Sequence, residues 1–153
     1  MRSALEEAEA AFREGEVPIG AVVVLDGEVV GRGRNRTLRT GQPFEHAEIV
    51  AMWEAVARVG ARGLEQAVLY STVEPCVMCI GAVLLARLPR VVFGAREPRT
   101  GACGSVFSIP DEPRQLHRVA VFGGVEEARC RELMQMFFAG RRESPPARES
   151  GSA

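Results

Sequence analysis

Two short motifs place metal-binding groups at the start of two predicted helices. The first, His46-Ala47-Glu48, opens segment 46–57, in which apolar residues recur at helical spacing. The second, Pro75 to Cys79, opens segment 76–85, with a proline at the helix start and two cysteines one turn apart. The two motifs can converge on one ion if both helices begin at the same edge of a sheet, where α/β proteins commonly place their sites. The motifs therefore constrain the fold as well as the chemistry.

The other predicted elements indicate an α/β sandwich. Short apolar runs rich in β-branched residues predict strands, and Asp26-Gly27 between the first two runs predicts a tight hairpin. Later in the chain helices alternate with strands, which indicates parallel strands joined by right-handed crossovers. We expect helices over 4–14, 46–57, 76–85 and 126–138, and strands over 19–25, 28–33, 68–73, 90–94 and 118–122.

We expect one domain over residues 1–140 and a disordered tail over residues 141–153. The length of 153 residues suits a single domain. The tail is mainly proline, serine and charged residues, with too few apolar side chains to order itself. Ala139-Gly140 is expected to interrupt the last helix, and segment 35–43 is expected to be a loop.

Composition and charge favour a cytoplasmic protein that does not enter a membrane. No run approaches the about 18 apolar residues of a membrane-spanning helix, and the acidic segment 1–7 does not resemble a signal peptide. The formal net charge of -1 gives no general sign of nucleic-acid binding. All 19 basic residues are arginines, however, and segment 31–44 contains four of them and no acid. Arginine is the side chain whose planar fork suits phosphate.

The motif residues are suited to a catalytic zinc site. His46, Cys76 and Cys79 supply three zinc ligands and leave one coordination position open, as in hydrolytic zinc enzymes. Zinc lowers the pKa of a bound water from about 15.7 to about 7. Glu48 lies two residues from the histidine, so it can reach the open position and carry a proton without binding the metal. The alternative is a closed structural site with a fourth ligand from Cys103 or His117, neither of which has ligand spacing.

The combination of H-x-E with P-C-x-x-C resembles the signature of zinc-dependent nucleobase deaminases. The chain as a whole resembles the bacterial tRNA-specific adenosine deaminases, which are part of the zinc-dependent cytidine and deoxycytidylate deaminase superfamily. The resemblance extends over residues 1 to about 143. The segments that carry it are 16–22, 33–36, 74–79, 91–96, 100–105, 117–119 and 137–142.

This resemblance implies a three-layer α/β/α cytidine-deaminase-like fold with a central five-stranded mixed sheet. It implies one Zn²⁺ per chain, held by His46, Cys76 and Cys79, with Glu48 as the catalytic proton carrier. The implied reaction is hydrolytic deamination of adenosine to inosine at the wobble position of tRNA, by a homodimer that binds the anticodon loop. The implied substrate contacts are Asn35, Ala47, Arg36 and Phe138, with phosphate contacts from Arg34, Arg36, Arg96 and Arg99.

One departure from the family favours an alternative substrate. The relatives have a small Thr-Ala pair before the ligand histidine, whereas this chain has Phe44-Glu45. A bulky ring and a negative charge suit a free base or nucleoside, such as guanine or cytosine, better than a polyanionic loop. A third hypothesis is a non-catalytic RNA-binding module, which would need no glutamate at position 48.

Overall fold

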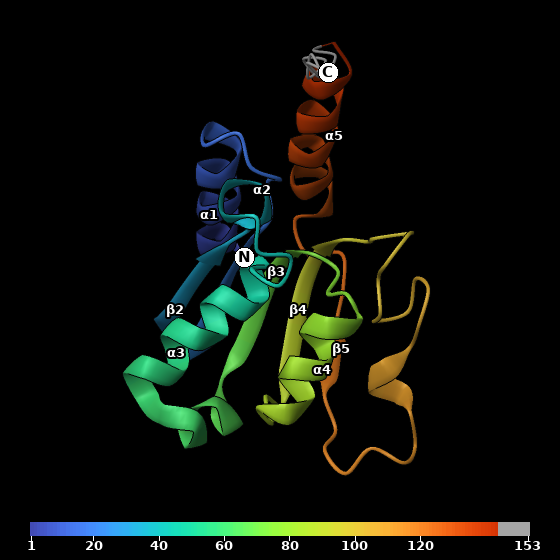
Figure 1. Ribbon diagram of the computed structural model, residues 1–153. Coiled ribbons are helices and arrows are strands. Elements are labelled where there is room, and N and C mark those ends of the chain that lie inside the picture. Colours follow the sequence, from blue (N-terminus) through green and yellow to red (C-terminus); the bar gives the residue numbers. More distant parts are fainter. Residues whose placement is uncertain (144–153) are drawn as a thin grey trace, which may run out of the picture.

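A mixed sheet of five strands forms the middle layer of the computed structural model, which describes residues 1–143 (Figure 1). The strands are β1 Gly20–Leu25, β2 Glu28–Arg34, β3 Val68–Val73, β4 Arg90–Ala95 and β5 Ala120–Phe122. They lie in the order β2-β1-β3-β4-β5. β1 is antiparallel to both of its neighbours, whereas β3, β4 and β5 run parallel. The mixed five-stranded sheet is therefore confirmed.

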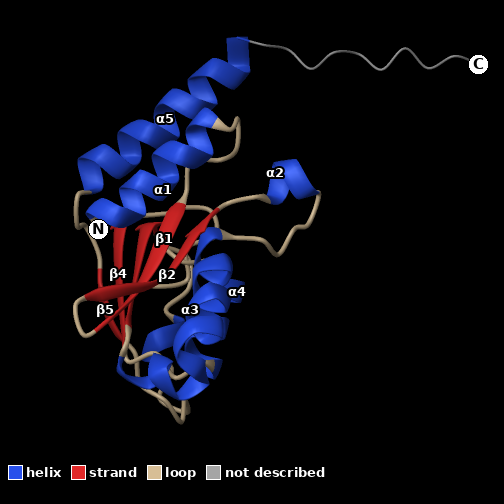
Figure 2. Cartoon of the chain, turned by 90° about the vertical axis from the view of Figure 1, so that its left-hand side faces the viewer, coloured by secondary structure: helices blue, strands red, loops and turns tan. Residues whose placement is uncertain are grey.

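Helices cover both faces of this sheet (Figure 2). They are α1 Arg2–Arg13, α2 Thr37–Thr40, α3 Ala47–Gly63, α4 Val77–Leu85 and α5 Glu127–Glu143, with short 3₁₀ turns at Leu64–Gln66 and Ile109–Asp111. α1 and α5 pack together on one face, and α3 and α4 lie on the other. α2 is a single turn in the loop that was expected between β2 and α3. The result is the predicted three-layer α/β/α architecture.

The hairpin between β1 and β2 forms where the sequence predicts it. Asp26 and Gly27 both have positive φ, 51° and 82°, as a two-residue type I′ turn requires. The ladder continues to the pair Gly20 and Arg34, with one irregularity between Val23 and Val24. The hairpin therefore brings the residues that follow β2 to the edge of the sheet at which β1 begins.

Glycine allows α3 to pack directly on β2. A Cβ atom added to Gly33 would lie 2.1 Å from the carbonyl oxygen of Ala47 and 2.4 Å from the amide nitrogen of Ala51. Both distances are far shorter than van der Waals contact, so a larger residue would push α3 away from the sheet. Because His46 directly precedes Ala47, Gly33 sets the depth at which the start of α3 lies.

Most of the apolar core fills the space between the sheet and the layer formed by α3 and α4. Ile80 and Val83 of α4 pack there with apolar residues of α3 and with the inner side chains of the strands, among them Val23, Leu69 and Val91. The core therefore anchors both helices whose starts carry the motifs. In the part of the chain that the structure describes, no helix is long and apolar enough to cross a bilayer.

α5 runs further than predicted. The interruption expected at Ala139-Gly140 is wrong, because the helix continues to Glu143. Phe137 packs edge-on against Phe12 of α1, with ring centroids 6.4 Å apart, and the Arg141 guanidinium lies 5.4 Å from the Phe137 centroid. These contacts offset the about 1 kcal/mol that glycine costs inside a helix. Residues 141–143 are thus helical and not part of a disordered tail, and the rest of the expected tail, 144–153, lies outside the described residues.

Candidate active site

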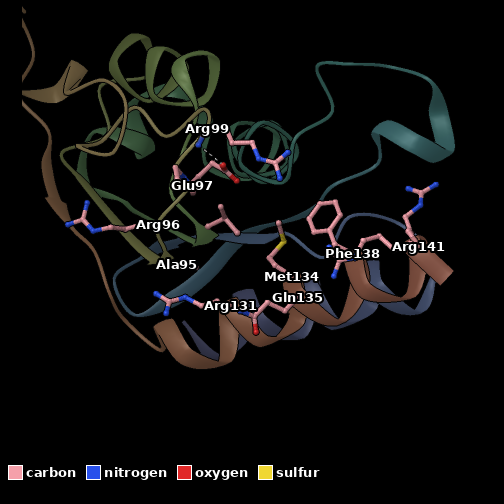
Figure 3. A pocket seen from close by; sticks show the side chains of 12 residues that line it. Ala95, Arg96, Glu97, Arg99, Arg131, Met134, Gln135, Phe138 and Arg141 are labelled. Atoms are coloured by element: carbon pink, nitrogen blue, oxygen red, sulfur yellow. Dashed lines mark hydrogen bonds between the residues drawn. The ribbon is translucent and has the colours of Figure 1, made fainter. Parts of the chain in front are cut away.

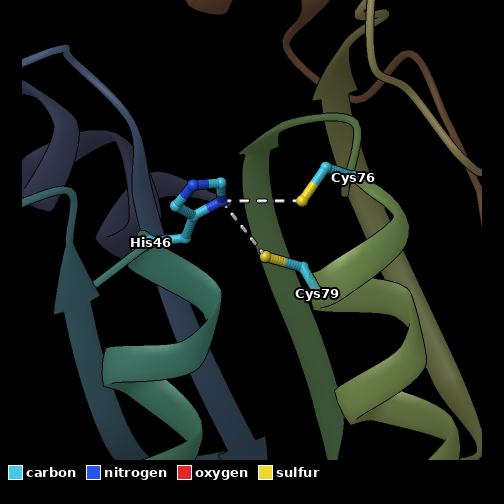
Figure 4. Close-up of side chains that lie close together, drawn as sticks. All are labelled: His46, Cys76 and Cys79. Atoms are coloured by element: carbon cyan, nitrogen blue, oxygen red, sulfur yellow. Dashed lines mark hydrogen bonds between the residues drawn. The ribbon is translucent and has the colours of Figure 1, made fainter. Parts of the chain in front are cut away.

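The potential metal ligands of the two motifs meet at the starts of α3 and α4 (Figure 4). His46 is the N-cap residue of α3 and Cys76 that of α4, and both have an extended backbone. The Nδ1 atom of His46 lies 3.6 Å from the Cys76 Sγ and 3.5 Å from the Cys79 Sγ. The ligand atoms all lie within 4.8 Å of one another. The structure therefore brings together the three predicted ligands from helices that begin at one edge of the sheet.

The spacing of these atoms fits a tetrahedral zinc ion. Bonds of about 2.0 Å to nitrogen and about 2.3 Å to sulfur, at a tetrahedral angle, place the two ligand atoms about 3.5 Å apart. The two distances from His46 agree with this value. Among the described residues, neither Cys103 nor His117 joins the cluster, and His117 Nε2 instead lies 2.9 Å from the carbonyl oxygen of Leu88. The donor set is therefore that of a zinc site with an open fourth position.

The two thiols differ sharply in acidity. The hydrogen bond from the Cys79 thiol, together with the one from the His46 ring, lowers the pKa of Cys76 to about 4 despite its burial. The same hydrogen bond and burial raise the pKa of Cys79. The shared hydrogen bond therefore favours the proton on Cys79 over Cys76. Because zinc binds thiolates, its binding releases the remaining proton.

Glu48 is a buried acid beside the cluster. It is 4% exposed, and burial raises the pKa of its carboxyl group above the ordinary 4.5. Its Oε1 accepts a hydrogen bond from Ser71 Oγ of β3 at 3.2 Å. A carboxyl group with a raised pKa can accept and return a proton closer to neutral pH. Ser71 was not predicted as a site residue, because a small hydroxyl in a buried strand is its only signal in the sequence.

A pocket of about 200 Å³ contains this chemistry. Asn35, His46, Glu48 and Cys76 all line it, together with Val17, Ile19, Thr37, Val73, Glu74, Glu97 and Thr100. The structure thus places Asn35 in the same pocket as the motif residues. Ala47, another expected substrate contact, is fully buried at the start of α3 and belongs to the apolar core.

A second pocket, of about 500 Å³, shares Val73 and Glu97 with the first. Arginines from the segment after β4 and from α5 line it (Figure 3): Arg96, Arg99, Arg131, Arg141 and Arg142. Among the residues that the structure describes, Glu97 is the one acidic residue in its lining. Phe138, 40% exposed, lies here and not in the pocket that contains His46. The second pocket is the larger, but the groups that can do chemistry lie in the first.

Two arginines expected at phosphates have other surroundings. Arg34 forms ion pairs with Glu7 and Glu14 of the α1 region, at 2.8 Å and 3.0 Å, so its charge is neutralised within the chain. Arg36 lines neither pocket, and its Nε atom is buried without a hydrogen-bond partner among the described residues. The arginines of the second pocket are therefore better placed to meet an anion than those after β2.

Glu74 connects the metal-binding helix to the long segment after β4. Its carboxylate accepts hydrogen bonds from the backbone N–H groups of Glu97, Cys103 and Ser105 at 3.0 to 3.1 Å, and from the Ser105 hydroxyl. Burial alone would raise the pKa of Glu74, but these hydrogen bonds outweigh it and the pKa is lowered. No role was predicted for Glu74 from the sequence. Its signal is an acid placed between a buried strand and Pro75.

The fold and the three-ligand centre with a buried glutamate define a zinc-dependent deaminase domain. Residues 1–95 match the family model of the cytidine and deoxycytidylate deaminase zinc-binding region. The chain therefore belongs to this family.

Within it, the chain is similar to two tRNA-specific adenosine deaminases. It is 44% identical to that of Streptococcus pyogenes, over 94% of this chain and 90% of the relative. It is 41% identical to that of Bacillus subtilis, over 96% and 91%. These matches confirm the resemblance seen in the sequence.

Solved structures agree with the fold. A structure from studies of A-to-I editing by deaminases acting at the wobble position of transfer RNA superposes with a TM-score of 0.82. It is 41% identical and covers 87% of this chain and 96% of that chain. A guanine deaminase from Nitrosomonas europaea superposes with a TM-score of 0.72 at 24% identity, over 89% and 81% of the two chains, and supports the fold alone.

Proposed function

We propose that this protein deaminates adenosine to inosine at the wobble position of tRNA by hydrolysis, using one zinc ion per chain. The observation that carries the proposal is the junction of two pockets. The small one is lined by His46 and Cys76 of the three-ligand cluster and by Glu48, and the adjoining one is lined by arginines. Relatives 41–44% identical over most of the chain carry the name tRNA-specific adenosine deaminase, which supports this substrate.

In the proposed mechanism His46, Cys76 and Cys79 hold the zinc ion. Bound zinc makes a water molecule acidic enough to yield its proton near neutral pH. Glu48 takes up this proton and delivers it to the ring nitrogen. In a second transfer it carries the remaining proton of the added hydroxyl group to the departing amine, so that adenosine and water become inosine and ammonia. Its burial suits this role, because a raised pKa brings the carboxyl group closer to the pH at which it must both accept and donate.

The sizes of the pockets favour one flipped base over a large free ligand. The about 200 Å³ pocket is smaller than the about 300 to 1,000 Å³ typical of sites that enclose a drug-sized molecule. We propose that it takes the extruded base, with Asn35 at its edge and Ala47 behind it. The neighbouring backbone then lies along the second pocket, where arginines meet phosphates and Phe138 offers a ring face. Arg36 lines neither pocket and has no contact in this arrangement.

We further propose that the protein acts as a homodimer in the cytoplasm, where tRNA is processed. Apolar side chains on the outer surface of α3 and α4 support the dimer. Trp53 is 58% exposed, and Val56, Val77 and Leu85 are exposed on the same two helices. Such a set of exposed apolar residues is typical of a surface that a partner covers.

One experiment tests the substrate. The zinc-loaded protein is incubated with an unmodified tRNA that has adenosine at the wobble position and, separately, with adenine, guanine, cytosine and cytidine. Inosine at the wobble position with no turnover of the free compounds is expected. Turnover of a free base without any change in the tRNA would favour the small-molecule alternative.

Glu48→Gln tests the proton carrier. This variant should retain about one zinc per chain and lose about 10² to 10⁴ in rate, and an active variant would contradict the assigned proton carrier.

A further inference from the structure

Glu16 is a buried carboxylate that the proposed mechanism does not use. It lies between α1 and β1, is 2% exposed and forms no ion pair with another described residue. Each of its oxygens accepts two hydrogen bonds. Oε1 accepts from the Val17 backbone and from Asn35 Nδ2, both at 2.9 Å. Oε2 accepts from the backbone of Leu38 at 2.9 Å and of Arg39 at 3.1 Å. A buried anion with four donors requires a specific arrangement of the chain around it.

This arrangement holds the Asn35 side chain by its nitrogen. Nδ2 donates to Glu16 Oε1 and also to Thr37 Oγ1, both at 2.9 Å. Because an ionised carboxylate can only accept, the amide nitrogen and not the oxygen must face Glu16. The backbone N–H of Asn35 is held as well, by the Ile19 carbonyl at 3.0 Å. Asn35 therefore has one side-chain orientation, fixed from behind, at the wall of the pocket that contains His46 and Glu48.

The same carboxylate fixes the segment around Asn35. Leu38 and Arg39 belong to α2, whose first N–H groups have no partner from a side chain of their own N-cap residue. Glu16 supplies that partner from another part of the chain. α2 and Asn35 are thus tied to one group, and neither can shift without losing hydrogen bonds to a buried charge.

We propose that Glu16 is a positioning residue for catalysis, which orients Asn35 toward the substrate. The proposal rests on the proposed function to the extent that Asn35 contacts the substrate. Glu16 itself touches no reacting atom, because it is separated from the pocket by Asn35 and α2. Its effect on turnover therefore passes through Asn35.

A double-mutant cycle tests this coupling in the zinc-loaded protein. Glu16→Gln keeps the shape of the side chain but places an N–H group against one set of donors, which allows Asn35 to turn. We expect Glu16→Gln and Asn35→Ala each to lower kcat/KM for wobble-adenosine tRNA by about 10- to 100-fold, with zinc content unchanged. The double variant should be no slower than the slower single variant. Independent, multiplicative losses would overturn the proposal.

Glu74→Gln provides a matched control, because Glu74 is an equally buried carboxylate that accepts N–H groups on another side of the same pocket. The fold-loss in kcat/KM caused by Glu74→Gln should multiply with the fold-loss caused by Asn35→Ala. If Glu16→Gln does not fold, Thr37→Val replaces it in the cycle, since it removes the other acceptor of Asn35 Nδ2 and leaves Glu16 in place. If Thr37→Val lowers kcat/KM equally in the wild-type and the Asn35→Ala background, that result would also count against the coupling.

A second readout needs no substrate and separates this inference from the proposed function. In a ¹⁵N spectrum of the zinc-loaded protein, the Asn35 side-chain amide is assigned by its absence in Asn35→Ala. We expect two well-dispersed signals from slowly exchanging amide protons. Their chemical shifts should move toward those of exposed amides in Glu16→Gln and, in part, in Thr37→Val. An Asn35 signal that Glu16→Gln leaves unchanged would reject the inference, whichever compound the enzyme deaminates.

Discussion

The Ser71 hydroxyl and the Glu48 carboxylate are joined by a hydrogen bond of 3.2 Å between two buried side chains. Ser71 lies on β3 and Glu48 in the first turn of α3, so the bond links the sheet to the proton carrier. A hydroxyl that donates to a carboxylate stabilises its charged form, whereas burial stabilises the neutral form. Two opposed effects therefore act on the protonation of Glu48, and the hydrogen bond from Ser71 can be removed by mutation.

Removal of the Ser71 hydroxyl should shift the acidic limb of the pH profile upward. Glu48 must be ionised to accept a proton, so activity falls as pH drops through its pKa, which burial already places above 4.5. Ser71→Ala removes a stabiliser of the ionised form and raises that pKa further, so the acidic limb moves to higher pH. The measurement is kcat/KM against pH. Thr72→Val, a buried hydroxyl whose partner is the Gly20 amide, serves as control. A downward shift in Ser71→Ala would contradict the assignment.

Neutralising Glu74 should loosen the segment 97–105. Glu74→Gln leaves some of the N–H groups of this segment without an acceptor, at a cost of about 1 to 3 kcal/mol in the free energy of unfolding. Because the folded-state pKa of Glu74 is lowered, the wild-type contribution is present above its unfolded pKa and is lost as pH falls. Urea unfolding at pH 7 and near pH 4 measures both effects. The stability difference between the two proteins should shrink at the lower pH, and a constant difference would be inconsistent with a titrating Glu74.

Two glycine substitutions should have opposite effects on stability. Gly33→Ala places a Cβ atom against the Ala47 carbonyl and should destabilise the fold by about 1 to 3 kcal/mol while weakening zinc retention. Gly140→Ala lies inside α5 with no atom within 4 Å of the new Cβ, and should stabilise by up to about 1 kcal/mol. Thermal unfolding measures the change in stability, and zinc content after purification measures the change in zinc retention. Equal zinc retention in the two variants would show that the contact of α3 with β2 does not position His46.

Arginines of the second pocket should account for part of the salt dependence of tRNA binding. Arg99→Ala combined with Arg142→Ala removes two cations from its lining. The slope of log Kd against the logarithm of the salt concentration should therefore fall by about 0.7 to 0.9 per lost phosphate contact. Arg114→Ala is the control, since Arg114 is exposed, pairs with Glu112 and lines neither pocket. An unchanged slope in the double variant would place the phosphates elsewhere.

The proposed dimer should dissociate when a charge is placed on its apolar surface. Trp53→Glu introduces a carboxylate on the exposed side of α3, where it would have to be buried in an interface without a partner. Light scattering should report a dimer for the wild type and a monomer for the variant. Leu116→Glu makes the same kind of change at a fully exposed loop position and should remain dimeric. A wild-type protein that is monomeric at micromolar concentration would contradict the proposed homodimer.

Local patterns in the sequence predicted most of the fold. Apolar runs located all five strands, and Asp26-Gly27 predicted the type I′ hairpin because its backbone preference is local. The end of α5 was mispredicted because glycine propensity is a weak local preference, whereas Phe12 of α1 packs on Phe137 from a distant part of the chain. Tertiary contacts of that kind have no signal in a single window of sequence.

The candidate site was predicted to a different degree in each of its parts. His46, Cys76 and Cys79 could be found because ligand chemistry dictates both residue type and spacing. Ser71, Glu16 and Glu74 could not, because their partners lie 19 to 31 positions away and depend on which strands pair. The same holds for Arg34, whose acid partners on and beside α1 become visible only when α1 packs against the hairpin.

Val73 and Glu97 line both pockets and form the wall between them, so a small substrate and a long one make different contacts. A substrate that fills only the small pocket gains none of the contacts made beyond that wall. Interactions with remote parts of a substrate can hold the reacting ring in place and so increase turnover, not only affinity. Free adenosine should therefore be a poor substrate mainly through kcat, even at concentrations that saturate the pocket. Raising the nucleoside concentration cannot replace the attached RNA.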